Sequence, residues 1–409
     1  MSRVAALLGV ATLGLGISPQ QQPSQPQFRA EVDLVRIEAQ VVDKDGTPMP
    51  NLTKDDFEVS FNYKSRRVVS AEFVRYDAKS STASNPKPTD RDSATKVMEG
   101  RRIFVLAIDE SSFRPEAARA AVTAAQRFLE HLQPNDVVGV FRYPMAEPKL
   151  TLVSDHAEAI KTLADVVGLL SAPPSEFHLS ASEVVDIGSD PSGTRGGAPA
   201  ALQRVVQREC PAASTGMPDM CGRRILAEAV SIVGYMEGRV AQSLAGLRGL
   251  LDAIAGIPVR KTLVVISGGL MAGDGAGARP NISAVTSAVG EQAARSNVNL
   301  YVMHLDSSFD DMFSADRGRN KSSVLRDDML LGLALDHFAG AAGGALFRIR
   351  GGLSDFAFDR VLRETSAYYL LGVAPEDTDR DGRIHFVQVK TKARGAEVRA
   401  RAQLVIPKR

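Results

Sequence analysis

The chain has 409 residues, 44% of them hydrophobic, which is enough for two or three domains with at least one well-buried core. Its 49 basic and 48 acidic side chains nearly cancel, so no net field draws the protein toward nucleic acid or an anionic membrane. The absence of Trp also argues against a stacking platform for single strands or sugars. We therefore do not expect a nucleic-acid partner.

The N-terminal residues 1–27 predict an export signal followed by a linker. Arg3 precedes an apolar, uncharged run over residues 4–17, which has signal-peptide length and is too short to span a bilayer. Residues 18–27 are rich in Gln, Pro and Ser, a composition typical of a flexible linker. The alternative is an apolar terminus that is not a signal, because no clear A-x-A cleavage site is present. We expect a secreted, periplasmic or cell-envelope protein with no membrane span in the mature chain.

The two cysteines, Cys210 and Cys221, lie close together in a stretch rich in Pro, Gly and Ser. In an oxidising compartment a disulfide between them would stabilise the loop by about 3 kcal/mol, so this pairing depends on export. There is no C-x-x-C motif and the six histidines are scattered, so neither zinc nor a redox motif is indicated.

Short alternating apolar patterns predict β-structure near both ends of the chain. Residues 28–77 predict a small β-sandwich-like domain, and residues 78–100 predict a linker because they are rich in Ser, Pro, Asp and Lys. Past residue 375, strands over 384–392 and 397–405 predict a C-terminal β-hairpin module spanning 375–409.

The region between them, residues 101–374, predicts an α/β domain. The apolar run 103–108 is typical of a strand buried on both faces. Further strands are expected at 137–143, 262–267, 298–305, 345–349 and 367–373, alternating with helices at 115–132, 157–170, 223–255, 283–296, 326–341 and 354–366. This βα repeat favours a doubly wound, mostly parallel sheet.

Two departures from this repeat are expected. Residues 171–222 are rich in Pro, Gly and Ser and predict an insertion that is either functional or disordered. The helix over 223–255 is long enough that we expect a break near Gly234 or Gly238.

Polar residues follow three of the expected strands. The first strand ends in Asp109 with Ser111 and Ser112, a later one in Ser267, and another in Asp306. Ligands of doubly wound sheets bind at the carboxyl ends of strands, where the strand order reverses. A carboxylate with hydroxyls is a hard-oxygen set, which suits Mg²⁺, Mn²⁺ or Ca²⁺ better than zinc.

The chain resembles the von Willebrand factor A domains, most closely the bacterial, Acidobacteria-type VWFA-related proteins. The resemblance covers about residue 28 to the C-terminus, and the segments that carry it are 32–37, 52–59, 260–267, 343–347 and 366–372. It implies a Rossmann-like fold and an adhesion-type, non-catalytic function, in which the chain binds a protein partner that the sequence does not name.

The resemblance also implies a metal-ion-dependent adhesion site, in which Asp-x-Ser-x-Ser on the first strand is completed by a later Thr and a later Asp. Asp109 and Ser111 match, but Phe113 stands at the third position and Gly268 where the later Asp belongs. Losing two of about six ligands lowers the affinity for a hard cation. We therefore predict a degenerate site at Asp109, Ser111, Ser112 and Ser267, with Asp306 as a substitute ligand. Alternatively, Asp109 and Ser111 cap the helix that begins at Pro115 or touch the partner directly.

A second calcium candidate is the acidic stretch Asp377, Asp379, Asp381 and Gly382, which has the spacing of an EF-hand loop. Its twelfth position is Gln388 instead of Glu, and strands flank it, so a solvated acidic turn is the alternative. The cofactor prediction is none, with Mg²⁺ or Ca²⁺ as the alternative.

Enzymatic alternatives find little local support. Ser111 and Ser112 lack a G-x-S-x-G elbow, and the glycines over residues 193–197 lack the Lys of a phosphate-binding loop. A hydrolase or nucleotide-binding protein that uses the Asp109 crevice stays as one alternative to a binding protein. A cell-envelope scaffold without a ligand stays as another.

Overall fold

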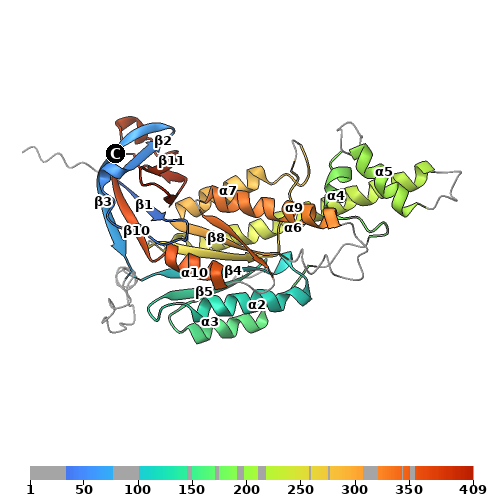
Figure 1. Cartoon of the computed structure of the whole chain (residues 1–409), viewed down its shortest axis with the longest axis horizontal. Coiled ribbons are helices and arrows are strands. Elements are labelled where there is room, and N and C mark those ends of the chain that lie inside the picture. The colour runs from blue at the N-terminus through green and yellow to red at the C-terminus, as the bar shows by residue number, and fades with distance from the viewer. Residues whose placement is uncertain are drawn as a thin grey trace, which may run out of the picture. The chain divides into compact units, whose positions relative to one another are not determined.

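The computed structural model describes residues 34–76, 101–144, 150–170, 175–190, 198–210, 218–257, 259–274, 277–306, 321–342, 344–350 and 355–408 (Figure 1). The expected signal peptide and linker over 1–27, the linker over 78–100 and the serines after Asp306 lie outside these residues. No helix in the described part of the chain has the length and apolarity that a bilayer crossing requires.

The described residues of the α/β part form a six-stranded sheet in the order β6-β5-β4-β7-β8-β9. Its strands are β4 Ile103–Asp109, β5 Val137–Tyr143, β7 Lys261–Ser267, β8 Val298–Asp306 and β9 Ala345–Arg350, all parallel, with the short β6 Leu152–Val153 antiparallel at the edge. Every residue of β4 and β7 is buried, as expected for apolar runs covered on both faces. The strand order reverses between β4 and β7.

Helices cover both faces of this sheet (Figure 1). One layer, built of α2 Pro115–Glu130, α3 His156–Thr162 and α10 Asp355–Glu364, packs on Phe104, Leu106 and Ile108. The other, built of α6 Pro218–Ala255, α7 Ser283–Arg295 and α9 Lys321–Ala341, packs on Val105 and Ala107. The predicted doubly wound, mostly parallel sheet is therefore confirmed for this part.

The β-structure at the two ends of the chain corrects our expectation. The expected N-terminal domain and C-terminal module form one seven-stranded antiparallel sheet among the described residues, in the order β12-β1-β10-β3-β2-β11-β13. Its strands are β1 Val35–Val42, β2 Phe57–Phe61, β3 Lys64–Arg75, β10 Ala367–Ala374, β11 Ile384–Thr391, β12 Glu397–Ala400 and β13 Gln403–Val405. Because its end strands β12 and β13 are consecutive in the chain, the sheet curls around a core that contains Phe61, Tyr369 and Leu371.

Strand β10 accounts for the error. We expected it to be the last strand of the parallel sheet, but it pairs with β1 and β3. Its burial alternates along much of its length, which suits an antiparallel sheet with one face on a core. An apolar strand does not specify its partners, and these lie about 290 to 340 residues earlier, so the sequence pattern could not reveal the pairing.

A buried polar cluster joins the two sheets within the compact unit Leu34–Arg409. Glu364 at the end of α10 is fully buried, and its carboxylate accepts hydrogen bonds from Arg360 Nε at 2.8 Å and Arg399 Nε at 2.9 Å. The Tyr301 hydroxyl contacts both Glu364 Oε2 at 3.2 Å and Gln40 Oε1 at 3.0 Å. The Glu364 carboxylate therefore connects side chains of α10, β8 and β12, and Gln40 of β1 joins this cluster through Tyr301.

The expected insertion over 171–222 contains helices. α4 Ala181–Gly188, α5 Ala198–Glu209 and the first half of α6 pack around their own apolar core, which includes Val184, Ile187, Val205, Ile225 and Val233. We call these three segments the helical lobe. Ser180 and Glu183 form a capping box at the start of α4, a signal in the sequence that would have predicted this helix.

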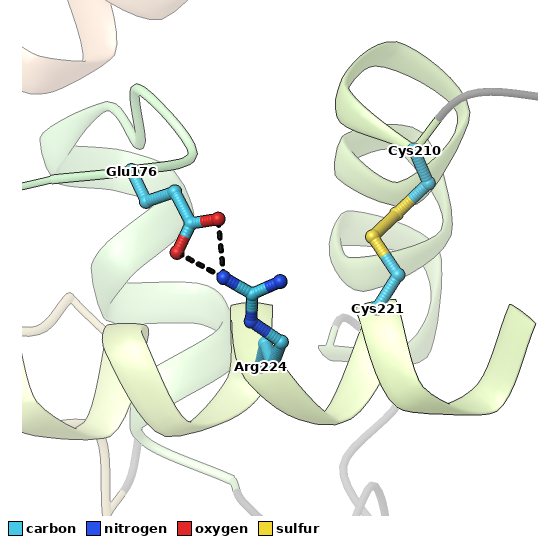
Figure 2. Close-up of a disulfide and its surroundings, with 4 residues drawn as sticks. All are labelled: Glu176, Cys210, Cys221 and Arg224. Atoms are coloured by element: carbon cyan, nitrogen blue, oxygen red, sulfur yellow. Dashed lines mark hydrogen bonds and ion pairs between the residues drawn. A yellow bond between two sulfur atoms is a disulfide. The ribbon is translucent and has the colours of Figure 1, made fainter. Parts of the chain in front are cut away.

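The predicted disulfide between Cys210 and Cys221 is present and joins the end of α5 to the start of α6 (Figure 2). Near it, Arg224 of α6 forms an ion pair with Glu176. The expected break in α6 is wrong, because the helix runs unbroken past Gly234 and Gly238. Both glycines face open space, and burial of the apolar residues around them outweighs the helix penalty of about 1 kcal/mol for each glycine.

Candidate functional site

Asp109 lies at the carboxyl end of β4, beside the point where the strand order reverses, and is fully buried. Its Oδ1 accepts a hydrogen bond from Ser111 Oγ at 2.7 Å. Its Oδ2 accepts from Ser243 Oγ at 2.8 Å and from Ser267 Oγ at 3.3 Å. Burial raises the pKa of Asp109, and the three hydroxyl donors oppose part of that rise.

Ser243 of α6 is the member of this cluster that the sequence analysis missed. It is buried in the same helix as Val240, Leu244 and Leu247, so a hydroxyl faces the sheet among apolar side chains. A polar residue on the apolar face of a predicted helix was the available signal. Its contact with Asp109 links α6 directly to the end of β4.

Ser112 has a different role from Ser111. Its Oγ donates to the Asp109 backbone carbonyl at 2.7 Å and accepts from the Gly268 amide at 2.7 Å. It thereby ties the loop after β4 to the loop after β7. A Cβ atom at position 268 would lie 2.6 Å from the Ser112 carbonyl oxygen, so this packing has no room for the aspartate that the family pattern places there.

The alternative that Asp109 and Ser111 cap the following helix is wrong. The N-cap residue of α2 is Arg114, and no side chain caps that helix end. The Asp109 carboxylate is instead held by the three serine hydroxyls, and Phe113 is buried in the core beneath α2.

Asp109 belongs to a polar row that crosses the carboxyl ends of the strands. Tyr143 is its register partner on β5, while Ser267, His304 and Arg348 are partners of one another along β7, β8 and β9. Asp328 of α9 contacts this row, with an oxygen 2.6 Å from Arg348 Nη1 and the other 3.9 Å from His304 Nε2. The Ser267 hydroxyl donates a hydrogen bond to Asp109 and is fully buried, so it is not arranged as an accessible nucleophile.

One chain segment covers the loop that follows β4. Residues 166–170 run along the loop after β4, where Val167 N donates to Glu110 Oε1 at 2.9 Å and Leu169 N to Glu110 O at 2.7 Å. Glu110 is buried, and burial raises its pKa while the Val167 amide and Arg142 oppose the rise. The Asp109 carboxylate is therefore satisfied within the protein, whereas Glu110 Oε2 is buried without a hydrogen-bond partner among the described residues.

The residues present do not fit the divalent cation that the resemblance implies. In the cluster that the described residues form, the acidic group is the Asp109 carboxylate, and both of its oxygens already accept hydrogen bonds from serine hydroxyls. Phe113 and Gly268 supply no side-chain oxygen where the family pattern has one. In the described part of the chain, no group of three His, Cys, Asp or Glu side chains is arranged to hold a metal. Hard cations are held by six or more oxygens, several of them charged.

We therefore expect calorimetric titration with Mg²⁺, Mn²⁺ or Ca²⁺ to give no saturable heat up to about 1 mM cation, because the Asp109 carboxylate would first have to release its hydroxyl donors. The same titration of Asp109→Ala is the control. Micromolar binding to the natural chain that disappears in Asp109→Ala would contradict this expectation.

The calcium candidate near the C-terminus is not assembled around one point. Asp379 forms a buried, bidentate ion pair with Arg66, with N–O distances of 2.6 and 2.7 Å, and this pair lowers the pKa of Asp379. Asp381 instead accepts from the Arg383 amide at 2.8 Å and contacts His385 Nε2 at 3.0 Å. Asp377 begins the short 3-10 turn Asp377–Asp379. The acidic stretch is a turn between β10 and β11 that Arg66 anchors, and its carboxylates do not converge as in an EF-hand.

No protein-family model matches the chain, and no curated protein matches it. Among solved structures, it is similar to the VWA domain of SpRpn10, with 12% identity and a TM-score of 0.25 over 63% of this chain and 93% of that one. It is also similar to a von Willebrand factor type A protein from Catenulispora acidiphila, with 11% identity and a TM-score of 0.30 over 88% of this chain and 75% of that one. These distant likenesses carry no argument about binding or activity. The α/β part has the doubly wound, mostly parallel sheet that the resemblance implied.

Proposed function

We propose that this chain is an exported, non-catalytic protein that binds a protein partner through the helical lobe and the adjoining start of α9. The observation that carries the proposal is the separate core of the lobe. Its apolar residues pack on one another and not on the parallel sheet, and a disulfide fastens two of its helices. The lobe has its own core and is not needed to cover the apolar faces of the parallel sheet. Its surface is therefore available for binding a partner.

The start of α9 is bound firmly to this lobe. The Ser182 amide donates to Asp327 Oδ1 at 2.7 Å, and Arg326 makes a bidentate pair with Asp186 at 2.6 and 2.7 Å. These contacts hold α9 against α4, so both helices contribute to one surface.

Two exposed apolar side chains lie at the start of α9. Leu325 and Met329, one turn apart, are 59% and 54% exposed. Met220 and Tyr235, on the α6 part of the lobe, are exposed as well. Leu, Met and Tyr side chains that remain in water next to ion pairs are typical of protein-binding patches with a polar rim. A disulfide is also compatible with the oxidising compartments that exported proteins enter.

Site-specific photocrosslinking tests the proposal. A photoreactive amino acid placed at 325 or 329 is expected to capture the same partner from an envelope fraction of the source cells. The matched control is position 356, where Phe356 is 61% exposed on α10, outside the lobe. With the photoreactive residue at 325, capture should also disappear when Met329 is replaced by Glu, provided that this variant has the same unfolding temperature as the natural chain. Equal labelling from all three positions, or none, would count against the proposal and favour a scaffold without a specific partner.

The competing hydrolase or nucleotide-binding function can be tested on the same purified protein. Its phosphatase and esterase turnover and its nucleotide binding would be measured beside Asp109→Ala. The burial of Ser267 and its hydrogen bond to Asp109 lead us to expect no turnover above background. Turnover that is lost in Asp109→Ala would overturn the non-catalytic proposal.

A further inference from the structure

A second surface of the molecule contains a pocket of about 310 Å³ between α7 and the outer side of β11 and β13. This volume is at the lower end of the range for small-ligand sites, which often lie between structural units. Its lining combines apolar, amide and charged side chains from both sides: Glu291, Arg295, Ile384, Arg401, Gln403 and Val405.

Gln403 is the polar group of the pocket that lacks a partner. Its side-chain oxygen is buried and has no hydrogen-bond partner among the described residues. A buried acceptor without a donor is unfavourable, so it is a natural point of contact for an N–H group of a ligand.

The apolar part of the pocket continues from Gln403 along the sheet. Ile384 faces Val405 and Phe386 faces Gln403 in the antiparallel pairing of β11 with β13, so these side chains share the outer face. Phe386 in turn stacks on Tyr63, with 5.3 Å between ring centroids, and both rings are exposed. Tyr63 holds a left-handed backbone conformation, with φ of +66°, that bulky side chains seldom adopt.

The charged part of the pocket is basic on balance. Arg295 of α7 has a side chain that is 58% exposed, and its contact with Glu291 at 3.6 Å is longer than a hydrogen bond. Arg401 adds a second guanidinium, which also interacts with Glu38. Guanidinium groups favour carboxylates because they present parallel N–H donors to two oxygens.

We propose that this pocket binds the C-terminal residue of a peptide. A peptide C-terminus carries a carboxylate, an amide N–H and a side chain on one residue. The carboxylate meets Arg295 and Arg401, the N–H donates to Gln403 Oε1, and an apolar side chain lies on Ile384 and Val405 next to Phe386. This site is separate from the helical lobe, so the two proposals stand or fall independently.

Fluorescence polarisation with two labelled probes tests the site. The probes are fluorescein-Gly-Ala-Ala-Phe with a free carboxylate and the same peptide as a C-terminal amide. We expect saturable binding of the acid and at least about tenfold weaker binding of the amide, since the amide removes the charge-assisted contact.

Variants of the full chain separate the contacts. Arg295→Gln should weaken the acid about tenfold and leave the amide unchanged, while Gln403→Leu should weaken both probes. Arg383→Gln is the matched control, because that side chain, in the turn before β11, is 84% exposed and does not line the pocket. Thermal unfolding would verify that each variant is folded.

Three results would overturn the proposal: no saturable binding of the acid up to about 1 mM, acid and amide affinities within twofold of each other, or equal losses in Arg295→Gln and Arg383→Gln.

Discussion

Replacing Glu364 by alanine is expected to lower the free energy of unfolding by about 3–5 kcal/mol. The carboxylate is fully buried and accepts from Arg360, Arg399 and Tyr301. Its removal leaves two guanidinium groups and a phenol hydroxyl without their shared acceptor at the joint between the two sheets. Urea denaturation followed by circular dichroism would measure the change.

The matched control is Glu397→Ala. Glu397 pairs with the same two arginines, at 3.2 Å from Arg360 and 2.9 Å from Arg399, but its side chain is 49% exposed. Solvent screening limits its expected contribution to about 1 kcal/mol or less. Equal losses of unfolding free energy in Glu364→Ala and Glu397→Ala would show that burial does not make Glu364 more important than Glu397 for the contact between the two sheets.

Replacing Arg66 by alanine is expected to be about as costly, at about 3–5 kcal/mol, because it leaves Asp379 buried without its bidentate partner. The double variant Arg66→Met with Asp379→Leu should recover most of this loss, since two apolar residues replace two buried charges. A double variant as unstable as Arg66→Ala would contradict this account.

The destabilisation by Arg66→Ala should also depend on pH. Arg66 lowers the pKa of Asp379 below its ordinary value of 3.8, so the ion pair stabilises the folded state fully above that value. As the pH falls through the lowered pKa, Asp379 takes up a proton and the contribution is lost. The gap in unfolding free energy between the natural chain and Arg66→Ala should therefore be largest near about pH 7 and be mostly lost once the pH falls well below about 4. A gap that persists to about pH 2.5 would contradict the assignment.

Local pattern in the sequence predicted those features that depend on residues near one another. The apolar runs predicted β4 and β7, and a polar group after each run predicted that Asp109 and Ser267 would meet. The Cys210–Cys221 disulfide was predictable in the same way, because the two residues are close in the chain. The spacing of the acidic residues after Glu376 led to a wrong prediction of a calcium loop, because spacing along the chain does not show which partners the carboxylates have. Asp379 pairs with Arg66, which lies more than 300 residues earlier.

Some features of the Asp109 cluster could be predicted from the sequence, and others depend on the tertiary structure. By itself, the sequence determined the parallel strands, the Asp-x-Ser start of the motif, and the loss of side-chain oxygens at Phe113 and Gly268. Only the folded chain decided that Ser243 of α6 completes the cluster and that β10 leaves the parallel sheet for the antiparallel one. Strand and helix patterns come from side-chain periodicity along a few residues, whereas these contacts depend on which distant surfaces bury each other.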